Sequence, residues 1–127
     1  MNTDGFYTIE EFKLENNKLD VLVALNKSHW VFDVHFPNNP IFPGAMNIQV
    51  LQELLSKVFD KKYVVGKILN TRFYIPIIPT KNNVVRYDIE FEKKEYELSV
   101  QCSVCSDSKN DAEKETFAKI SALFIPA

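Results

Sequence analysis

The sequence predicts an α+β domain in which an antiparallel sheet curls around one long helix. Three observations carry this prediction. Residues 44–60 form a mainly apolar segment without proline, which is long enough for about four helical turns. Segments before and after it alternate apolar and polar residues at the two-residue period of a strand. These strands are the only large supply of apolar faces that can cover the helix, so we expect them to wrap it.

The segment before the helix predicts a hairpin. Residues 9–12 predict a short helical turn that leads into a strand ending near Glu15. Asn16 and Asn17 predict a tight turn, because asparagine tolerates the backbone angles that turns require. The return strand is indicated by apolar residues at every second position, namely Leu19, Val21, Val23 and Leu25.

The predicted helix carries one polar stripe on an otherwise apolar surface. Its polar residues recur at helical spacing and therefore share one side: Gln49, Gln52, Glu53, Ser56 and Asp60. The rest of the circumference is apolar: Ile48, Val50, Leu51, Leu54, Leu55, Val58 and Phe59. A helix of this kind must be mostly buried.

The segment after the helix predicts a meander of strands. Residues 85–92 alternate between apolar and polar types, as do residues 96–104, and residues 93–95 form a short connection between them. Residues 116–125 predict a last strand. The order of hairpin, helix and meander fits one domain over residues 1–127.

Composition excludes several classes of protein. The formal net charge of -2 gives no reason to expect a nucleic-acid partner, since binding phosphates requires a concentrated basic surface. No apolar stretch approaches the roughly 20 residues that span a bilayer. Residues 1–5 lack the charged and apolar regions of a signal peptide. We therefore expect a cytoplasmic protein that binds neither nucleic acid nor membrane.

The two cysteines match the spacing of a redox or zinc pair only superficially. Cys102 and Cys105 are three residues apart, which places their sulfurs on opposite faces of a strand. The chain holds 2 cysteines in all, so no second pair completes a zinc site. We predict buried or incidental thiols and no metal site.

A proline-rich loop before the helix carries the clearest candidate for chemistry. Residues 35–44 read His-Phe-Pro-Asn-Asn-Pro-Ile-Phe-Pro-Gly, so three prolines stiffen the loop that holds His35. Such a histidine is either a loop anchor or a catalytic base. Gly44 stands where a helix start leaves backbone N–H groups free to stabilise an oxyanion, although a tight turn also favours glycine. His29, beside Trp30, has no motif and is expected to be structural.

The loop and helix at residues 35–49 resemble the signature of FabA/FabZ-type 3-hydroxyacyl-acyl-carrier-protein dehydratases. Those proteins carry His-Phe-Pro-x-x-Pro-x-x-Pro-Gly, and residues 35–44 match every fixed position. Residues 72–79 are similar to a later strand of the family, except that Thr-Lys at residues 80–81 replaces its Gly-Asp. The resemblance implies a hot-dog fold that works as a homodimer with the active site shared across the interface, and it leaves higher oligomers open.

The resemblance also implies a mechanism. His35 would take the C2 proton of a 3-hydroxyacyl thioester, and the amide of Gly44 would hold the thioester oxygen. No cofactor is needed, because acyl carrier protein delivers the substrate on its phosphopantetheine arm. The candidate substrate-binding residues are Phe36, Pro43, Ala45 and Asn47. The candidate docking residues for the acidic carrier, chosen by charge, are Lys57, Lys61, Lys62 and Arg72.

One position departs from the family pattern. The helix carboxylate, which in the family comes from the partner subunit and helps water leave, falls here on Gln49, whose amide cannot act as an acid. Glu53 lies one turn further along the polar stripe and is the candidate replacement. Three functions in fatty-acid or related lipid or polyene biosynthesis therefore stay open: a dehydratase (hydro-lyase), a hot-dog thioesterase and a non-catalytic acyl-binding subunit.

Overall fold

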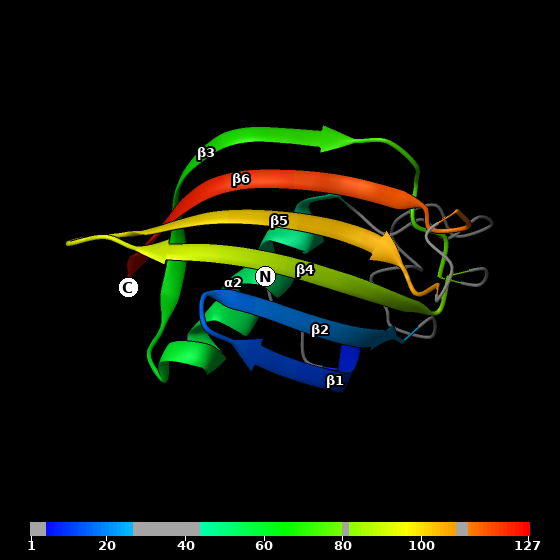
Figure 1. The fold of residues 1–127 in the computed structure, drawn as a ribbon, viewed down its shortest axis with the longest axis horizontal. Helices are drawn as coiled ribbons and strands as arrows, with labels where there is room; N and C mark the ends of the chain where they lie inside the picture. The colour runs from blue at the N-terminus through cyan, green and yellow to red at the C-terminus, as the bar shows by residue number, and fades with distance from the viewer. Residues whose placement is uncertain (1–4, 27–43, 80–81, 109–111) are drawn as a thin grey trace.

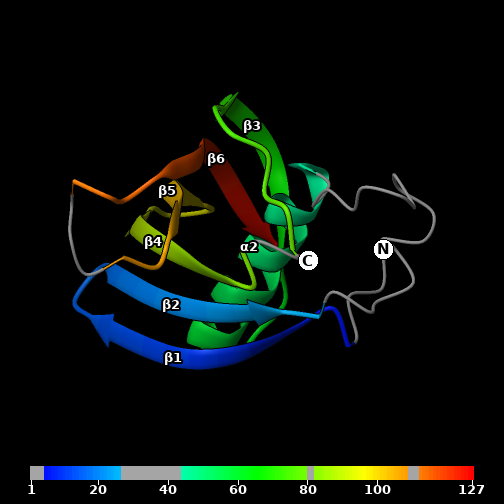
Figure 2. The same cartoon turned by 90° about the vertical axis from the view of Figure 1, so that its right-hand side faces the viewer.

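Six antiparallel strands and one helix make up the described part of the chain. The computed structural model describes residues 5–26, 44–79, 82–108 and 112–127. The strands form one sheet in the order β1-β2-β4-β5-β6-β3, which curves around the helix α2 (Figures 1 and 2). This arrangement confirms the predicted α+β class. The elements are β1 (Tyr7–Glu15), β2 (Lys18–Leu25), α2 (Gly44–Phe59), β3 (Tyr63–Phe73), β4 (Val84–Lys93), β5 (Leu98–Ser106) and β6 (Thr116–Pro126).

The first strand contains a bulge where the sequence predicted a helical turn. Residues 9–12 are part of β1, so the predicted turn is wrong. The pairing of β1 with β2 shifts register between Ile9 and Glu11, which leaves one extra residue in β1. Phe12 therefore lies opposite the buried Val21. Glu10 and Glu11 interrupt the alternation of apolar and polar residues in this strand. The bulge accommodates this interruption, and no helical turn is formed.

Two residues other than glycine adopt left-handed backbone angles at the ends of elements. Asn16 has φ 56° in the turn between β1 and β2, and Asp60 has φ 51° directly after α2. The Lys61 N–H donates to the Ser56 carbonyl at 3.2 Å, which closes the last turn of the helix. The predicted hairpin turn is confirmed, and α2 ends at Phe59, one residue before the predicted end.

Burial follows the predicted apolar pattern of the helix in part, because Ile48, Val58 and Phe59 are only partly buried and pack against the core. The buried residues of α2 occupy much of its circumference: Met46, Asn47, Val50, Leu51, Leu54 and Leu55. The sheet covers them with alternating residues of its central strands, among them Val85, Tyr87, Ile89, Leu98, Val100, Cys102 and Val104. Complete burial of a large apolar side chain stabilises the fold by about 1.5–3 kcal/mol. The helix and the sheet therefore depend on each other for stability.

The polar stripe of α2 binds the start of β3. The Val65 N–H donates to Gln52 Oε1 at 2.7 Å. The Tyr63 N–H donates to Ser56 Oγ at 2.9 Å, and Ser56 Oγ donates to the Gln52 carbonyl at 2.7 Å. These bonds satisfy backbone groups of an edge strand and hold β3 against the helix. The stripe predicted from the sequence thus has a structural role over part of its length.

The meander is confirmed, with two boundaries that differ from the prediction. β5 begins at Leu98, and Tyr96 lies 78% exposed in a connection closed by the bond from the Lys94 N–H to the Glu97 carbonyl at 2.8 Å. In the segment 72–79, only the first two residues belong to β3. Proline has no N–H to donate, so Pro76 and the proline that follows it cannot extend the ladder.

Among the described residues, no helix is long and apolar enough to cross a membrane.

Replacing Gln52 tests whether the helix holds β3. We expect Gln52→Leu to lower the free energy of unfolding by about 1–3 kcal/mol, because the partly buried Val65 N–H loses its acceptor. Urea unfolding measures this change. Gln101→Ala is the matched control, since the Gln101 amide binds Ser121 on the exposed face of the sheet, and we expect a change within about 0.5 kcal/mol. Equal effects of the two substitutions would contradict the anchoring role.

Candidate active site

A pocket of about 480 Å³ opens at the start of α2. Gly44 and Asn47 of the helix form one side, and Phe117 and Ala118 of β6 form another. The segment after β3 supplies apolar side chains to the remaining wall, namely Tyr74, Ile75, Pro76 and Ile77, together with Phe73 from the strand end. An apolar cleft with few polar groups is the usual form of a small-molecule site.

Gly44 is favoured by the close approach of an aromatic ring. A Cβ atom at this position would lie 3.0 Å from two ring carbons of Phe73. Gly44 is not among the described residues with positive φ, so the tight turn offered as the alternative explanation does not account for this glycine. As the first residue of α2, it begins the turn whose N–H groups lack helical partners. This helix start can stabilise negative charge on an oxygen bound in the pocket.

Asn47 is the buried polar residue beside this opening. Its side chain is 2% exposed, and its Oδ1 accepts a hydrogen bond of 2.8 Å from the Tyr87 hydroxyl. Tyr87 is 0% exposed, and burial raises the pKa of its hydroxyl well above the usual value, with smaller contributions from Cys102 and Tyr7. Tyr87 therefore remains a neutral hydrogen-bond donor at physiological pH.

Gln49 and Glu53 form a second polar cluster with Tyr7 of β1. The Tyr7 hydroxyl donates to Glu53 Oε1 at 2.6 Å, and Gln49 Nε2 donates to Glu53 Oε2 at 3.4 Å. Burial raises the pKa of Tyr7 above its usual range, and the hydrogen bond to the Glu53 carboxylate and its charge add to the rise. A short bond to an ionised acceptor is strong, so Tyr7 fixes the position of this carboxylate.

The pocket and the second cluster lie on different sides of α2. At 3.6 residues per turn, the five-residue step from Gly44 to Gln49 places the two positions about 140° apart around the helix axis. Asn47 accordingly contacts β4, whereas Glu53 contacts β1. Within one chain, the structure does not bring Gln49 and Glu53 into the pocket with Gly44.

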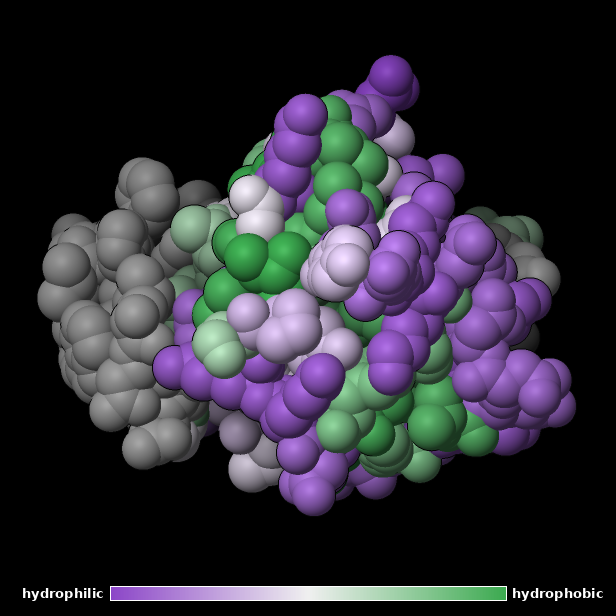
Figure 3. Space-filling model, turned by 90° about the vertical axis from the view of Figure 1, so that its left-hand side faces the viewer, coloured by the Kyte–Doolittle hydropathy of each residue, from purple (hydrophilic) through white to green (hydrophobic). Residues whose placement is uncertain are grey.

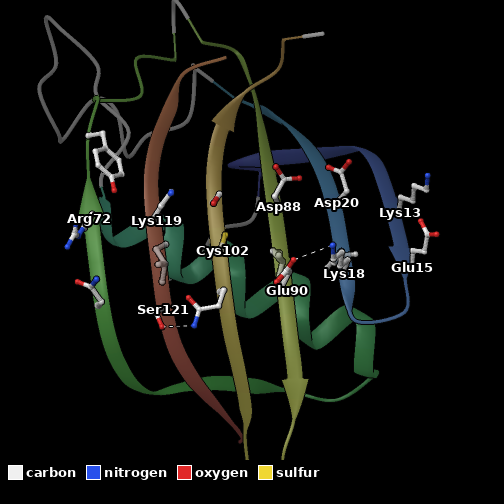
Figure 4. Close-up of a pocket in the computed structure, with 17 residues that line it drawn as sticks. Lys13, Glu15, Lys18, Asp20, Arg72, Asp88, Glu90, Cys102, Lys119 and Ser121 are labelled. Carbon is white, nitrogen blue, oxygen red and sulfur yellow. Dashed lines mark hydrogen bonds and ion pairs between the residues drawn. The ribbon is translucent and has the colours of Figure 1, made fainter. Parts of the chain in front are cut away.

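The positive docking candidates also fall on separate surfaces. Arg72 lies on the face of the sheet away from the helix, where it pairs in register with Lys119 of β6. Figure 4 shows both in a hollow of about 820 Å³ that acidic residues such as Asp88 and Glu90 also line. This hollow is larger than the pocket at the helix start, but its mixed charges and its distance from the helix start make it a poor site for an apolar acyl chain.

The three lysines lie near the far end of α2. The Lys57 ammonium is 5.9 Å from the ring centroid of Phe12, and that of Lys61 is 5.4 Å from the ring centroid of Tyr63. Lys57, Lys61 and Lys62 are exposed. They can form one positive surface, which Arg72 does not join.

Several predicted residues lie outside the described part of the chain. They are His35, Phe36 and Pro43, together with His29, for which a structural role was expected. Of the other predicted substrate-binding residues, Ala45 is exposed and Asn47 lines the pocket.

The cysteines are buried and free, as predicted. Cys102 belongs to the core and Cys105 pairs in register with Arg86, whose side chain binds acidic residues on the outer face. Burial raises the pKa of both thiols, so neither is an activated nucleophile. Among the described residues, no group of three or more histidine, cysteine or acidic side chains can hold a metal ion.

Comparison with known proteins identifies the family. The sequence profile of the ApeI-like family, described as ApeI dehydratase, matches residues 11–112. The chain belongs to the ApeI-like dehydratase family. A dehydratase FabZ from Clostridium acetobutylicum, which acts on 3-hydroxyacyl-acyl-carrier-protein, is 31% identical over 70 residues. That match covers 50% of this ApeI-like chain and 48% of the FabZ enzyme, so the chain aligns with about half of its relative.

Solved structures confirm the hot-dog fold of this ApeI-like protein. A chain of the dehydratase heterocomplex ApeI:P from Xenorhabdus doucetiae superposes with a TM-score of 0.72 at 15% identity, over 94% of this chain and 97% of that one. A thioesterase family protein from Silicibacter pomeroyi superposes with a TM-score of 0.60 at 9% identity, over 98% of this chain and 87% of that one. At these identities the likeness concerns the fold.

Sequence reasoning missed the two tyrosines that position the polar residues of α2. The alternation over residues 85–92 places Tyr87 on the apolar side of its strand and predicts no further role for it, and the sequence pattern predicts no role for Tyr7. A buried tyrosine hydroxyl usually finds a hydrogen-bond partner, so an inward-facing tyrosine opposite a helix with polar residues was the available signal.

Replacing Tyr7 tests its bond to Glu53. We expect Tyr7→Phe to be less stable than the wild type by about 1–3 kcal/mol near pH 8, because Glu53 loses a donor. Tyr7 has a raised pKa when folded, so the stability it contributes is present below its unfolded pKa of about 10 and is lost as pH rises above that value. The free energy of unfolding, measured in urea from about pH 8 to about pH 11, should therefore fall less steeply with rising pH for Tyr7→Phe than for the wild type.

Tyr96→Phe is the matched control, because Tyr96 is 78% exposed. It should have the same free energy of unfolding as the wild type near pH 8 and the same decrease in that free energy as pH rises. If the free energy of unfolding of Tyr7→Phe fell as steeply with rising pH as that of the wild type, the bond to Glu53 would not raise the pKa of Tyr7.

Proposed function

We propose that this chain dehydrates 3-hydroxyacyl thioesters carried on acyl carrier protein in fatty-acid or related lipid or polyene biosynthesis. The observation that carries the proposal is the apolar pocket at the start of α2, in a chain of the ApeI-like dehydratase family. The local similarity to FabZ supports the same substrate class. The reaction requires a base at C2, a site for the thioester oxygen and an acid for the leaving hydroxyl.

The proposed steps assign one group to each requirement. His35 removes the C2 proton while backbone N–H groups at Gly44 stabilise the negative charge that develops on the thioester oxygen. The C2–H electron pair then forms the C2–C3 double bond as the C3–O bond breaks. Glu53 in its acid form gives a proton to the hydroxyl, which leaves as water, and Gln49 hydrogen-bonds the carboxylate that remains. Solvent then takes the C2 proton from His35 and returns a proton to Glu53. A positioned acid or base of this kind contributes about 10²- to 10⁴-fold to the rate.

The separation of the two polar sites on α2 supports a shared active site. Gly44 and Asn47 face one pocket, whereas Gln49 and Glu53 face another side of the same helix. A complete site then requires the pocket of one chain and the Gln49–Glu53 cluster of a second chain. This requirement agrees with a homodimer, and it also permits a second, different subunit, since the similar chain from Xenorhabdus doucetiae belongs to a dehydratase heterocomplex.

The edge of the sheet at β3 is the proposed contact between subunits. Large apolar side chains are exposed along this edge and the segment after it: Ile68, Leu69, Phe73, Tyr74 and Ile75. The view of Figure 3, from the end near the C-terminus, shows hydrophobic residues among hydrophilic ones toward β3. Exposed edge strands with apolar side chains favour pairing with another chain. Two such edges would join the sheets of two subunits.

The carrier protein is proposed to dock at the lysines beyond α2. Lys57, Lys61 and Lys62 are exposed and can attract an acidic partner, and Arg72 is a separate candidate on the outer face. The phosphopantetheine arm brings the acyl group, so the chemistry needs no cofactor of the enzyme itself.

A non-catalytic acyl-binding subunit is the second candidate. The amide of Gln49, at the position where the FabA/FabZ-type signature carries a carboxylate, favours it. The thioesterase alternative has less support, because the similarity to a thioesterase family protein is limited to the fold.

Product analysis tests the dehydratase assignment. Purified protein is incubated with 3-hydroxyacyl-carrier-protein substrates, and product masses are measured. We expect the enoyl product from the wild type, none from His35→Ala, and a rate about 10²- to 10⁴-fold lower from Glu53→Gln. Glu90→Gln, which removes a carboxylate on the outer face, is the control and should retain the wild-type rate.

Other products would redirect the assignment. A free acid would indicate a thioesterase. The absence of both products, with binding of the acyl carrier retained, would favour the non-catalytic subunit. Unchanged enoyl formation in Glu53→Gln would remove Glu53 from the mechanism.

A charge on the β3 edge tests the proposed dimer. We expect Leu69→Lys to raise the dimer dissociation constant about tenfold or more, because a lysine would be buried in an apolar contact. Light scattering after size-exclusion chromatography measures the mass at several concentrations. Tyr96→Lys, at an exposed aromatic residue outside this edge, should leave the dimer intact. A wild-type monomer, or equal masses for the two variants, would contradict the proposal.

A further inference from the structure

The pocket at the start of α2 contains a buried amide with one unused donor. Asn47 is 2% exposed and lines the pocket. Its Oδ1 is occupied by the Tyr87 hydroxyl, and within the described residues no hydrogen bond engages its Nδ2. The described residues also contain no fully buried side-chain nitrogen or oxygen without a partner. The Asn47 nitrogen is therefore not fully buried, and the pocket that Asn47 lines is the opening within its reach.

Tyr87 determines which end of the amide faces the pocket. Its hydroxyl is fully buried, and Asn47 is its hydrogen-bond partner in the described part of the chain. If the amide were rotated by half a turn, Nδ2 would face the hydroxyl, whose hydrogen would then have no acceptor. A buried donor without an acceptor costs free energy, so the orientation with Oδ1 toward Tyr87 is favoured. The consequence is a fixed N–H donor that points into the pocket.

The surroundings of this donor restrict what it can bind. The other side chains of the pocket are apolar, except for the hydroxyl of Tyr74, a residue that is 51% exposed. A purely hydrocarbon ligand would cover the Asn47 nitrogen without giving it an acceptor. A ligand with an oxygen at this depth would satisfy it. The pocket thus discriminates in favour of an acyl group that carries an oxygen.

The position of Asn47 on the helix indicates which oxygen. Three residues separate it from Gly44, which corresponds to about 4.5 Å along the helix axis. If the thioester oxygen lies at the N–H groups of Gly44, as the proposed function requires, an oxygen two carbons further along the acyl group is within reach of Asn47. That oxygen is the 3-oxygen of a 3-hydroxyacyl group.

We infer that Asn47 is a specificity-determining donor for the 3-oxygen of the bound acyl group, and that Tyr87 is the positioning residue that orients it. This inference rests on the proposed function for the placement of the thioester. It adds a selectivity that dehydration alone does not require: the pocket binds 3-oxygenated acyl groups in preference to unsubstituted ones.

Binding of two stable analogues tests the inference. The ligands are acyl-pantetheine amides of equal chain length, in which an NH group replaces the thioester sulfur and the carbonyl oxygen is kept, one with a 3-hydroxyl and one without. Titration calorimetry measures each affinity. We expect the wild type to prefer the 3-hydroxy analogue about tenfold. Tyr87→Phe should reduce this ratio to within about twofold while changing the affinity for the unsubstituted analogue by less than about threefold.

Asn47→Leu provides a second test that does not depend on Tyr87. It should abolish the preference and bind the unsubstituted analogue at least as well as the wild type does, because an apolar side chain replaces the unpaired donor. Tyr63→Phe is the matched control, since Tyr63 is 3% exposed and is absent from the pocket, and it should retain the wild-type ratio.

Two results would overturn the inference. One is equal affinity of the wild type for both analogues. The other is an equal weakening of both analogues in Tyr87→Phe and Asn47→Leu, which would indicate a structural role only. The binding measurement does not depend on turnover, so the two proposals can fail separately. A protein that prefers the 3-hydroxy analogue but forms no enoyl product would contradict the dehydratase assignment and still support the donor role of Asn47.

Discussion

Wrapping α2 in a curved sheet removes most of its side chains from water, so each polar group that the helix carries inward needs a partner within the protein. The apolar residues meet this condition by packing. Gln52 and Ser56 meet it by accepting backbone N–H groups of β3. The Oδ1 atom of Asn47 and the Glu53 carboxylate meet it through the hydroxyls of Tyr87 and Tyr7. The same constraint that stabilises the fold therefore fixes the edge strand and the polar side chains of the candidate site.

The helix separates two kinds of chemistry because its side chains point in different directions. Its first residues face an apolar pocket with backbone donors and one side-chain donor. The next turn carries a carboxylate and an amide toward β1. Neither group alone supports an elimination of water, which requires charge stabilisation and proton transfer at neighbouring atoms. Joining two chains at the β3 edge is the proposed way to bring the two groups onto one substrate.

Much of this arrangement could be predicted because it follows from hydrophobic periodicity. The long helix, its polar stripe and the alternating strands β4 and β5 all depend on side-chain patterns that local sequence records. The bulge in β1 could not be predicted, because consecutive glutamates fit a helix start as well as an irregular strand. The roles of Tyr7 and Tyr87 were missed for another reason: their partners lie 46 and 40 residues away in the sequence. The close contact between Gly44 and Phe73 is also a long-range feature.

The most direct test of the account is a crystal structure of the protein with a stable 3-hydroxyacyl-pantetheine analogue. The account predicts that the thioester-equivalent oxygen lies at the N–H groups of Gly44 and that the 3-oxygen lies within hydrogen-bond distance of Asn47 Nδ2. It also predicts a second chain joined at β3 whose Glu53 approaches the same 3-oxygen. An acyl group bound in the charged hollow beside Arg72 and Lys119, with the pocket at the helix start empty, would contradict it.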